Sequence, residues 1–392
     1  MTGIILLNGQ AQDMNTFDVI VIGAGPGGSA AAYLLAAAGM RVALIDKASF
    51  PRDKLCGGML SGRTEKVYKS IFGDGWHDVY EFTASGARFF YKTQLLNEVS
   101  DYRRMHFTMR SSFDHRLVKL ACAKGATLLE KARADSLDPG KGLVRLANGE
   151  TLRGDFIIGA DGALSTVARN LGLSMRKDTL AAGLEIEMPR HGNMADLARP
   201  EIHFGVIRWG YGWVFPKRDT LTIGIAGLVQ KNRSLRNSFR VFLEQVCSNV
   251  PDIKWKGHPI PFCNFVLRPG IGNVLLVGDA AGFVEPVTGE GIAFAMQSAG
   301  CAADAVLDAA KGGDPQSALR HYQNRYSGIA RLLTQANWMR YLVFPAISEK
   351  LFSKALQKSK SLIHRYMDLA ADEIDYADYS KFLVKKLALH FF

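Results

Sequence analysis

Apolar residues form short unbroken runs at three places in the chain and follow helical spacing near its end. Phe17–Ile22, Phe156–Ile158 and Asn273–Val277 are such runs, as expected of strands buried on both faces of a parallel sheet. Between about 181 and 261, strands alternate with turns, and from Gln316 to Phe392 the pattern is helical throughout. The pattern therefore predicts a parallel sheet, a second sheet of a different kind and a helical tail.

The first run opens a strand–turn–helix–strand unit. Phe17–Ile22 leads into a glycine-rich turn, an alanine-rich helix over Ser29–Gly39, a strand over Met40–Ile45 and then Asp46. In such a unit the helix N-terminus binds a pyrophosphate and the acid after the second strand accepts hydrogen bonds from a ribose. The unit thus predicts a bound dinucleotide, and its candidate contacts are Gly23, Gly25, Gly27, Gly28, Asp46 and Lys47.

Two later strand ends carry an aspartate in a glycine-rich turn. They are Gly159-Ala160-Asp161-Gly162 and Gly278-Asp279-Ala280-Ala281-Gly282. Ligands bind at the C-terminal ends of strands in open α/β sheets. A further turn, Gly289–Gly291, opens an alanine-rich helix whose N-terminus would favour an anionic ring. The candidate cofactor contacts are Asp161, Gly162, Gly278, Asp279, Gly289, Gly291 and Ile292.

Two segments between these motifs carry further candidate residues. Cys56, Gly57 and Gly58 lie in a proline- and glycine-rich loop, where the glycines would let backbone pass close to a flat ligand. The thiol is equally consistent with a small buried side chain. Arg110 precedes a helix that we expect to be capped by Ser111 or Ser112, which makes this arginine a candidate phosphate or flavin contact, or else a solvated residue.

A row of aromatic residues marks the segment from Arg208 to Lys217. Four large rings recur at period two, so they share one face of a strand, while Gly210 and Gly212 leave the other face nearly bare. Such a stripe is typical either of ordinary core or of a cavity wall. The candidate substrate contacts are Trp209, Tyr211, Trp213, Phe215, Pro216 and Lys217.

Composition narrows the classes of partner and compartment. The net charge of +11 would favour cofactor phosphates or anionic lipid head groups, and the chain has no module typical of nucleic-acid binding. Five scattered cysteines predict neither a metal site nor a disulfide framework. Without a signal peptide or an apolar run long enough to span a bilayer, we expect a cytoplasmic protein. Basic helices in the tail suggest peripheral membrane contact, or plain surface helices with a solvated basic face.

Taken together, the three glycine motifs resemble the FAD-binding set of the para-hydroxybenzoate-hydroxylase-type flavoproteins. Within that superfamily the chain is most similar to the geranylgeranyl reductase family. The shared features are the loop from Pro51 to Cys56-Gly57-Gly58, the run Tyr211-x-Trp213-x-Phe215-Pro216-Lys217, and Gly278–Gly282 followed by Pro286–Gly291. One departure is Glu285, where the family pattern has Asn or Asp; it adds negative charge beside the expected flavin.

The resemblance implies an FAD-dependent reductase of carbon–carbon double bonds in an isoprenoid chain. It places Asp46 on the adenosine ribose, Asp279 on the ribityl chain and Cys56, Gly57 and Gly58 beside the reacting ring. The electron donor would be NAD(P)H or ferredoxin. Alternatives are a flavin monooxygenase or halogenase-like enzyme, or a non-catalytic membrane-associated flavin- or lipid-binding protein.

The implied fold class is α/β. A Rossmann-type FAD-binding domain would comprise residues 14–85, 105–180 and 262–315. An antiparallel β-sheet substrate domain would comprise 86–104 and 181–261, and a helical C-terminal region would follow over 316–392.

Overall fold

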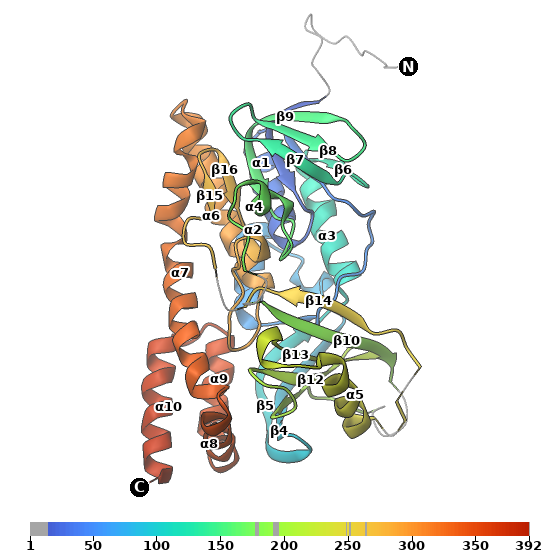
Figure 1. The fold of residues 1–392 in the computed structure, drawn as a ribbon, viewed down its shortest axis with the longest axis vertical. Helices are drawn as coiled ribbons and strands as arrows, with labels where there is room; N and C mark the ends of the chain where they lie inside the picture. The colour runs from blue at the N-terminus through green and yellow to red at the C-terminus, as the bar shows by residue number, and fades with distance from the viewer. Residues whose placement is uncertain are drawn as a thin grey trace, which may run out of the picture.

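Two sheets lie one beyond the other along the length of the molecule (Figure 1). The structure is a computed structural model that describes residues 15–176, 180–190, 196–247, 249–250, 252–262 and 265–391. A long helix, α7 (Ala318–Val343), runs beside both layers, and the helices that follow it lie beside the second sheet (Figure 1). Residues 1–14 and Cys263, one of the five cysteines, fall outside the described part.

The first sheet is built around the three apolar runs. Its strand order is β15-β16-β9-β1-β2-β6, with β7 and β8 joined through β9. Strands β16, β9, β1, β2 and β6 are parallel, so the expected parallel sheet is confirmed. The bounds are β1 Thr16–Ile22, β2 Val42–Ile45, β6 Thr127–Leu129, β7 Ala134–Asp138, β8 Leu143–Leu146, β9 Thr151–Gly159, β15 Gly270–Ile271 and β16 Val274–Leu276.

Helices pack on this sheet, and two of them, α1 and α4, begin shortly after its strands β1 and β9 end. They are α1 (Pro26–Ala37), α2 (Gly62–Phe72), α3 (Arg110–Ala123), α4 (Thr166–Asn170) and α6 (Ile292–Lys311). Helix α1 begins at Pro26, earlier than the sequence indicated, because proline is well suited to the first helical position.

The expected cap of α3 was wrong. The helix begins at Arg110, and the N-cap is Met109 rather than Ser111 or Ser112. Arg110 belongs to the first turn because its guanidinium binds Asp114, four residues further on the same helix face, through Nε and Nη2 at 2.8 Å each.

The second sheet is mostly antiparallel, in the order β14-β10-β13-β12-β11-β4-β5-β3. Among the described strands of this sheet, only β11 and β4 pair in parallel. Helix α5 (Leu235–Val246) packs on one face through Phe239 and Phe242. Strands β4 and β5 belong to this sheet over their full length, which exceeds the expected 86–104. The bounds are β3 Met59–Leu60, β4 Phe82–Tyr91, β5 Gln94–Phe107, β10 Ala181–Pro189, β11 Glu201–Phe204, β12 Gly210–Pro216, β13 Thr220–Leu228 and β14 Lys256–Ile260.

The tail is helical, as the pattern predicted. Helices α8 (Ala346–Lys358), α9 (Lys360–Ala370) and α10 (Tyr376–Phe391) follow α7. Their apolar side chains, including Leu356 and Ile363, pack on Phe89 and Val99 of the second sheet. Lysines 350, 354, 358 and 360 are exposed. The apolar faces of α8 and α9 are therefore used inside the protein.

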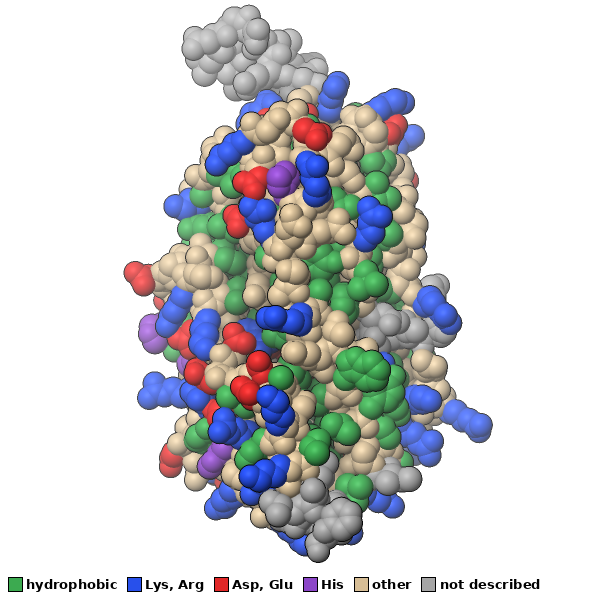
Figure 2. Space-filling model, turned by 90° about the vertical axis from the view of Figure 1, so that its left-hand side faces the viewer, with side chains coloured by type: hydrophobic (Ala, Val, Ile, Leu, Met, Phe, Trp, Pro, Cys, Tyr) green, Lys and Arg blue, Asp and Glu red, His purple; other side chains and the backbone are tan. Residues whose placement is uncertain are grey.

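Figure 2 views the molecule from the side of α7 and the tail helices. Basic side chains on this face are interspersed with acidic ones rather than gathered in a single stripe. Within the described residues, none of the helices combines the length and the apolarity that crossing a bilayer requires.

A buried carboxyl on α8 makes folding stability pH-dependent. Glu349 is 8% exposed, and it accepts a hydrogen bond from the Gly205 N–H at 3.1 Å. Burial raises the pKa of Glu349 to about 7, although the Gly205 N–H and Lys92 act in the opposite direction. Because the pKa is higher in the folded chain, this group's stabilisation is present at low pH and is lost as pH rises towards 7.

We expect Glu349→Gln to stabilise the protein at pH 8 and to have little effect at pH 5. The gain in the free energy of unfolding should be roughly 1–2 kcal/mol, because the amide carries no charge to desolvate. Urea unfolding of variant and wild type at both pH values measures it. Glu244→Gln on the exposed face of α5 is the control. Equal differences at the two pH values would contradict this role for Glu349.

Candidate functional site

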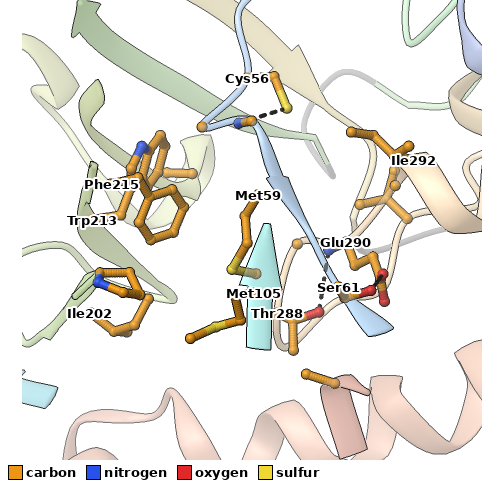
Figure 3. A pocket seen from close by; sticks show the side chains of 18 of the residues that line it. Cys56, Met59, Ser61, Met105, Ile202, Trp213, Phe215, Thr288, Glu290 and Ile292 are labelled. Atoms are coloured by element: carbon orange, nitrogen blue, oxygen red, sulfur yellow. Dashed lines mark hydrogen bonds between the residues drawn. The ribbon is translucent and has the colours of Figure 1, made fainter. Parts of the chain in front are cut away.

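A cavity of about 230 Å³ lies where the two sheets and the tail meet. Its wall is largely apolar and comes from segments far apart in sequence. Figure 3 shows Trp213, Phe215 and Ile202 on one side, Ile292, Glu290, Ser61 and Thr288 on the other, and Cys56 at one end. The cavity thus joins the glycine motifs of the first sheet to the aromatic strand of the second.

The aromatic wall comes from β12. Tyr211, Trp213 and Phe215 line the cavity, and Trp213 and Phe215 are nearly buried. Behind Trp213 the neighbouring strand β13 has Gly224, where a Cβ would lie 2.3 Å from the indole ring. Position 57 is equally restricted, because a Cβ on Gly57 would lie 2.7 Å from the Phe215 ring. Glycine at both places lets the rings lie flat beside the Cys56 loop.

The other expected substrate contacts lie outside the cavity. Trp209 has a positive φ of 53°, which takes it off the strand's alternation, and its ring packs edge-on against Tyr341 of α7 at 5.2 Å. Lys217 is 2% exposed, and its Nζ lies 3.1 Å from a carboxylate oxygen of Glu187. Pro216 ends the strand, buried, and is also outside the wall. Three of the four rings, those of Tyr211, Trp213 and Phe215, therefore share the cavity face of the strand. The positive φ at Trp209 turns the fourth ring away from that face.

The loop before α6 forms the facing wall. Thr288, Gly289, Glu290, Gly291 and Ile292 line the cavity, and α6 begins at Ile292 with Gly291 as N-cap, as expected. The Tyr211 hydroxyl donates to the Thr288 carbonyl, which ties this loop to the aromatic strand.

Glu285 braces this loop. Its carboxylate is 1% exposed and accepts the backbone N–H groups of Val287, at 2.8 Å, and Thr288, at 2.5 Å. It also accepts the Thr288 hydroxyl. The negative charge of Glu285, which the family pattern lacks, is therefore balanced by hydrogen bonds from donors of the same loop.

Charged residues gather at the first-sheet end of the cavity. Asp279 follows β16, and one of its carboxylate oxygens lies 3.4 Å from Lys54 Nζ. Burial tends to raise the pKa of Asp279, but the positive charges of Lys54 and Arg110 outweigh it, so that the pKa is lowered. Arg110 also lines the cavity. Burial tends to lower the pKa of Arg110 and the negative charge of Asp114 tends to raise it, and the pKa is raised overall. Asp279 is thus an ionised acceptor, as a ribityl hydroxyl would require.

The glycine-rich turn after β1 has the form of a pyrophosphate cradle. A Cβ at Gly25 would meet no protein atom closer than Arg52 Nη2, at 3.7 Å, whereas a Cβ at Gly28 would lie 1.8 Å from the Gly23 carbonyl. Asp46 is 7% exposed and accepts the Ala24 N–H at 2.9 Å, which places it beside the turn. Lys47 is exposed. Space over Gly25 and free N–H groups at the start of α1 suit an anionic ligand.

The Asp161 carboxylate is turned towards its own chain. It accepts the Ser165 hydroxyl at 2.5 Å and the Thr166 and Val167 N–H groups at 2.6 and 3.3 Å. It thus stabilises the N-terminus of α4, and neither Asp161 nor the adjacent Gly162 lines the cavity. Their assignment as cofactor contacts remains a prediction.

The Cys56 loop lies at the junction of the two walls. Gly58 donates its N–H to the Cys56 sulfur at 3.4 Å, and the Cys56 N–H donates to Glu185 Oε1 at 2.8 Å. Cys56 is a free thiol, and Cys56, Gly57 and Gly58 all line the cavity.

Sequence reasoning missed two contributions to the site. Glu185 of β10 holds the Cys56 loop, and only its place in a strand register could have indicated it. Helix α9 supplies Tyr366, Met367 and Ala370 to the far end of the cavity, and no motif in the tail predicted this. Polar bonds fix the tail there, since Arg63 of α2 binds Asp372 at 2.9 Å.

Comparison with known proteins fits this arrangement. A family model described as an FAD binding domain matches residues 16–191 and 264–337. An uncharacterised protein of Methanosarcina barkeri is 32% identical over 79% of this chain and 80% of its own length. A digeranylgeranylglycerophospholipid reductase of Methanococcus aeolicus is 26% identical over 94% of this chain and 95% of its own length. A menaquinone reductase of Mycolicibacterium smegmatis is 29% identical over 84% of this chain and 87% of its own length.

Solved structures share the fold. A geranylgeranyl bacteriochlorophyll reductase-like protein of Thermoplasma acidophilum superposes with a TM-score of 0.75 at 22% identity, covering 95% of this chain and 96% of that one. A probable FAD-dependent monooxygenase of Pseudomonas aeruginosa has a TM-score of 0.65 at 20% identity, covering 84% and 96%. At these identities the likeness shows fold alone.

The chain belongs to the FAD-binding-domain family, and within it to the geranylgeranyl reductase group of flavoproteins. It is an FAD-dependent oxidoreductase. The open cradle over Gly25, the ionised Asp279 and the flat, glycine-lined cavity fit FAD. When bound, this group supplies hydride chemistry.

Proposed function

We propose that this protein reduces carbon–carbon double bonds in the prenyl chain of a lipid. The observation that carries the proposal is the apolar cavity, which begins at the flavin motifs and runs between the β12 rings and α9. A long hydrocarbon chain needs such a channel, whereas a small polar substrate would leave most of it unused. The reductases among the relatives support the same class of substrate.

The residues of the cavity would act chiefly by alignment. An isolated alkene is a poor hydride acceptor, so its position relative to the hydride source must contribute much of the rate. Tyr211, Trp213 and Phe215 would hold the chain and keep water out. Gly57 lets the loop approach those rings, and Asp279 and Arg110 would hold polar parts of the cofactor at the other end.

The electrons would come from an external reductant, either NAD(P)H or ferredoxin. Reduction of a membrane lipid would also require contact with the bilayer surface from the cytoplasmic side. The exposed lysines of α8 and α9 are suited to anionic head groups, and their buried apolar neighbours exclude deep insertion of those two helices. Contact would thus be electrostatic and sensitive to salt.

An anaerobic titration tests the proposal. The FAD-loaded protein is reduced with dithionite, geranylgeranyl diphosphate is added, and flavin absorbance is followed together with the mass of the lipid. We expect reoxidation of the flavin with a gain of two mass units for each bond reduced. Digeranylgeranylglycerophospholipid and menaquinone substrates, tested in parallel, distinguish the head group.

The monooxygenase fold neighbours define the contrary outcome. If the reduced flavin stays inert with every prenyl substrate and reacts only when oxygen is admitted, the reductase proposal is wrong. Hydroxylation or halogenation of an added aromatic compound would then define the activity. Flavin that binds but supports neither reaction would instead favour a carrier or sensor.

A further inference from the structure

Glu185 lies on the same face of the second sheet as the aromatic rings of β12, although it does not itself line the cavity. In the sheet register it is paired with Gly224 of β13, and Gly224 is in turn paired with Trp213 of β12. Residues directly opposite one another in adjacent strands share a face. Because Gly224 has no side chain, nothing on that strand separates the carboxyl of Glu185 from the edge of the indole.

Two buried polar atoms in this cluster have no partner. Glu185 is 6% exposed; its Oε1 accepts the Cys56 N–H at 2.8 Å, while its Oε2 makes no hydrogen bond. The indole Nε1 of Trp213 is likewise buried and unpaired, and it faces Gly57 at 3.2 Å from the position of a Cβ there. Buried polar groups in proteins are nearly always hydrogen-bonded. Two unpaired atoms beside one cavity, Glu185 Oε2 and Trp213 Nε1, therefore suggest that both bind the same partner.

The surroundings of Glu185 favour its neutral form. Burial raises the pKa of Glu185 to about 7, although the Cys56 N–H and Lys217 act to lower it. The charged or titratable groups that face it are Glu187 on its own strand, Lys217 beyond β12, and Lys256 and His258 on β14. Lys217 is already paired with Glu187, which limits its effect. A carboxylic acid at this position can both give up and recover a proton near neutral pH.

We propose that Glu185 is the proton store of the site and that it acts through one water molecule held by its Oε2 and by the Trp213 indole N–H. This inference rests on the proposed alkene reduction. The bound flavin, once reduced, would supply the hydride that forms a C–H bond at one alkene carbon. The π electron pair then takes a proton from the water at the other carbon, and the water recovers its proton from Glu185. The resulting carboxylate is reprotonated from solvent.

The buried carboxylate at Glu290 is a poorer candidate for this role. One of its oxygens accepts the Ser61 and Thr64 hydroxyls, and Arg63 lies 3.9 Å from the other. Its partners therefore fix it as part of the contact between α2 and the loop before α6. Among the carboxyl groups that the structure describes, only Glu185 combines an unpaired oxygen with a position beside the aromatic wall.

Glu185→Gln removes the proton and keeps an oxygen for the Cys56 N–H. In a single turnover of the reduced, FAD-loaded protein we expect oxidation of the flavin by prenyl substrate to slow by about 100-fold or more. We expect the wild-type rate to fall above pH 7, where Glu185 loses its proton, and we expect this fall to be absent in the variant. Trp213→Phe, which keeps a ring and loses the N–H, should show a smaller loss of rate than Glu185→Gln. Glu349→Gln, another buried carboxyl with a raised pKa, is the control.

A second readout does not depend on turnover. Infrared difference spectra of wild-type protein between pH 6 and pH 8 should contain the carbonyl band of a protonated carboxylic acid that Glu185→Gln lacks and Glu349→Gln retains. If that band is absent at pH 6, or if Glu185→Gln turns over at the wild-type rate, the inference is wrong. Glu185→Asp, which keeps an acid on a shorter stem, should recover part of the rate, and no recovery would equally overturn it.

The two proposals fail in different ways. If wild-type protein does not reduce any prenyl substrate, the proposed function falls, while the infrared band still reports whether Glu185 stores a proton. If wild-type protein reduces a prenyl substrate and the band is missing, only the inference about Glu185 falls.

Discussion

Trp213→Ala should slow prenyl reduction about 100-fold while leaving FAD bound. The indole forms the middle of the aromatic wall, between Tyr211 and Phe215. Its loss would let the alkene shift relative to the hydride source, and a misplacement of about 1 Å can slow an aligned reaction about 100-fold. Single-turnover oxidation of the reduced flavin by prenyl substrate measures the effect, with flavin absorbance and the melting temperature recorded on the same samples.

The stability cost of this substitution should be moderate. Removing a large aromatic side chain from a packed core costs about 3–5 kcal/mol. One side of the Trp213 ring borders the cavity, so fewer contacts are lost and a smaller value is expected. Trp255→Ala is the matched control, because that ring packs on Phe239 of α5, on the other face of the sheet. Loss of flavin in Trp213→Ala, with retention in the control, would show that the strand supports the cofactor domain instead.

Gly25→Leu should yield a folded protein that binds FAD at least about 100-fold more weakly. The backbone at Gly25 has φ −77°, which any residue adopts, and a Cβ there would meet no protein atom nearer than 3.7 Å. The leucine side chain would instead occupy the space over the start of α1, where a pyrophosphate must approach the free N–H groups. Fluorescence titration of apo-protein with FAD measures the affinity.

Gly28→Ala is the informative contrast to Gly25→Leu. A Cβ at Gly28 would lie 1.8 Å from the Gly23 carbonyl, so this substitution should disrupt the turn itself and lower the melting temperature of apo-protein. Apo-protein of Gly25→Leu should melt at the wild-type temperature. Wild-type FAD affinity in Gly25→Leu would mean that the dinucleotide does not pass over this glycine.

The sequence alone determined the local elements of the cofactor half. Phe17–Ile22, the glycine turn and Asp46 form one short unit whose geometry is local. A buried parallel strand needs a mostly apolar run, and a helix N-terminus that binds a pyrophosphate needs glycine beside it. The same holds for the tail helices, whose helical spacing is a local property. The predicted start of α3 was wrong because the bond from Arg110 to Asp114 holds the arginine in the first turn of the helix.

Only the tertiary structure decided which residues share the cavity. A positive φ at Trp209 turns its ring away from the cavity, and an ion pair with Glu187 holds Lys217 outside the cavity. Glu185 and Tyr366 entered the site from a strand and a helix that carry no motif. Strand register and helix docking depend on contacts between distant segments, and no local pattern specifies them. The sequence thus determined the cofactor cradle, whereas long-range packing decided the shape of the cavity and the position of Glu185 beside its aromatic wall.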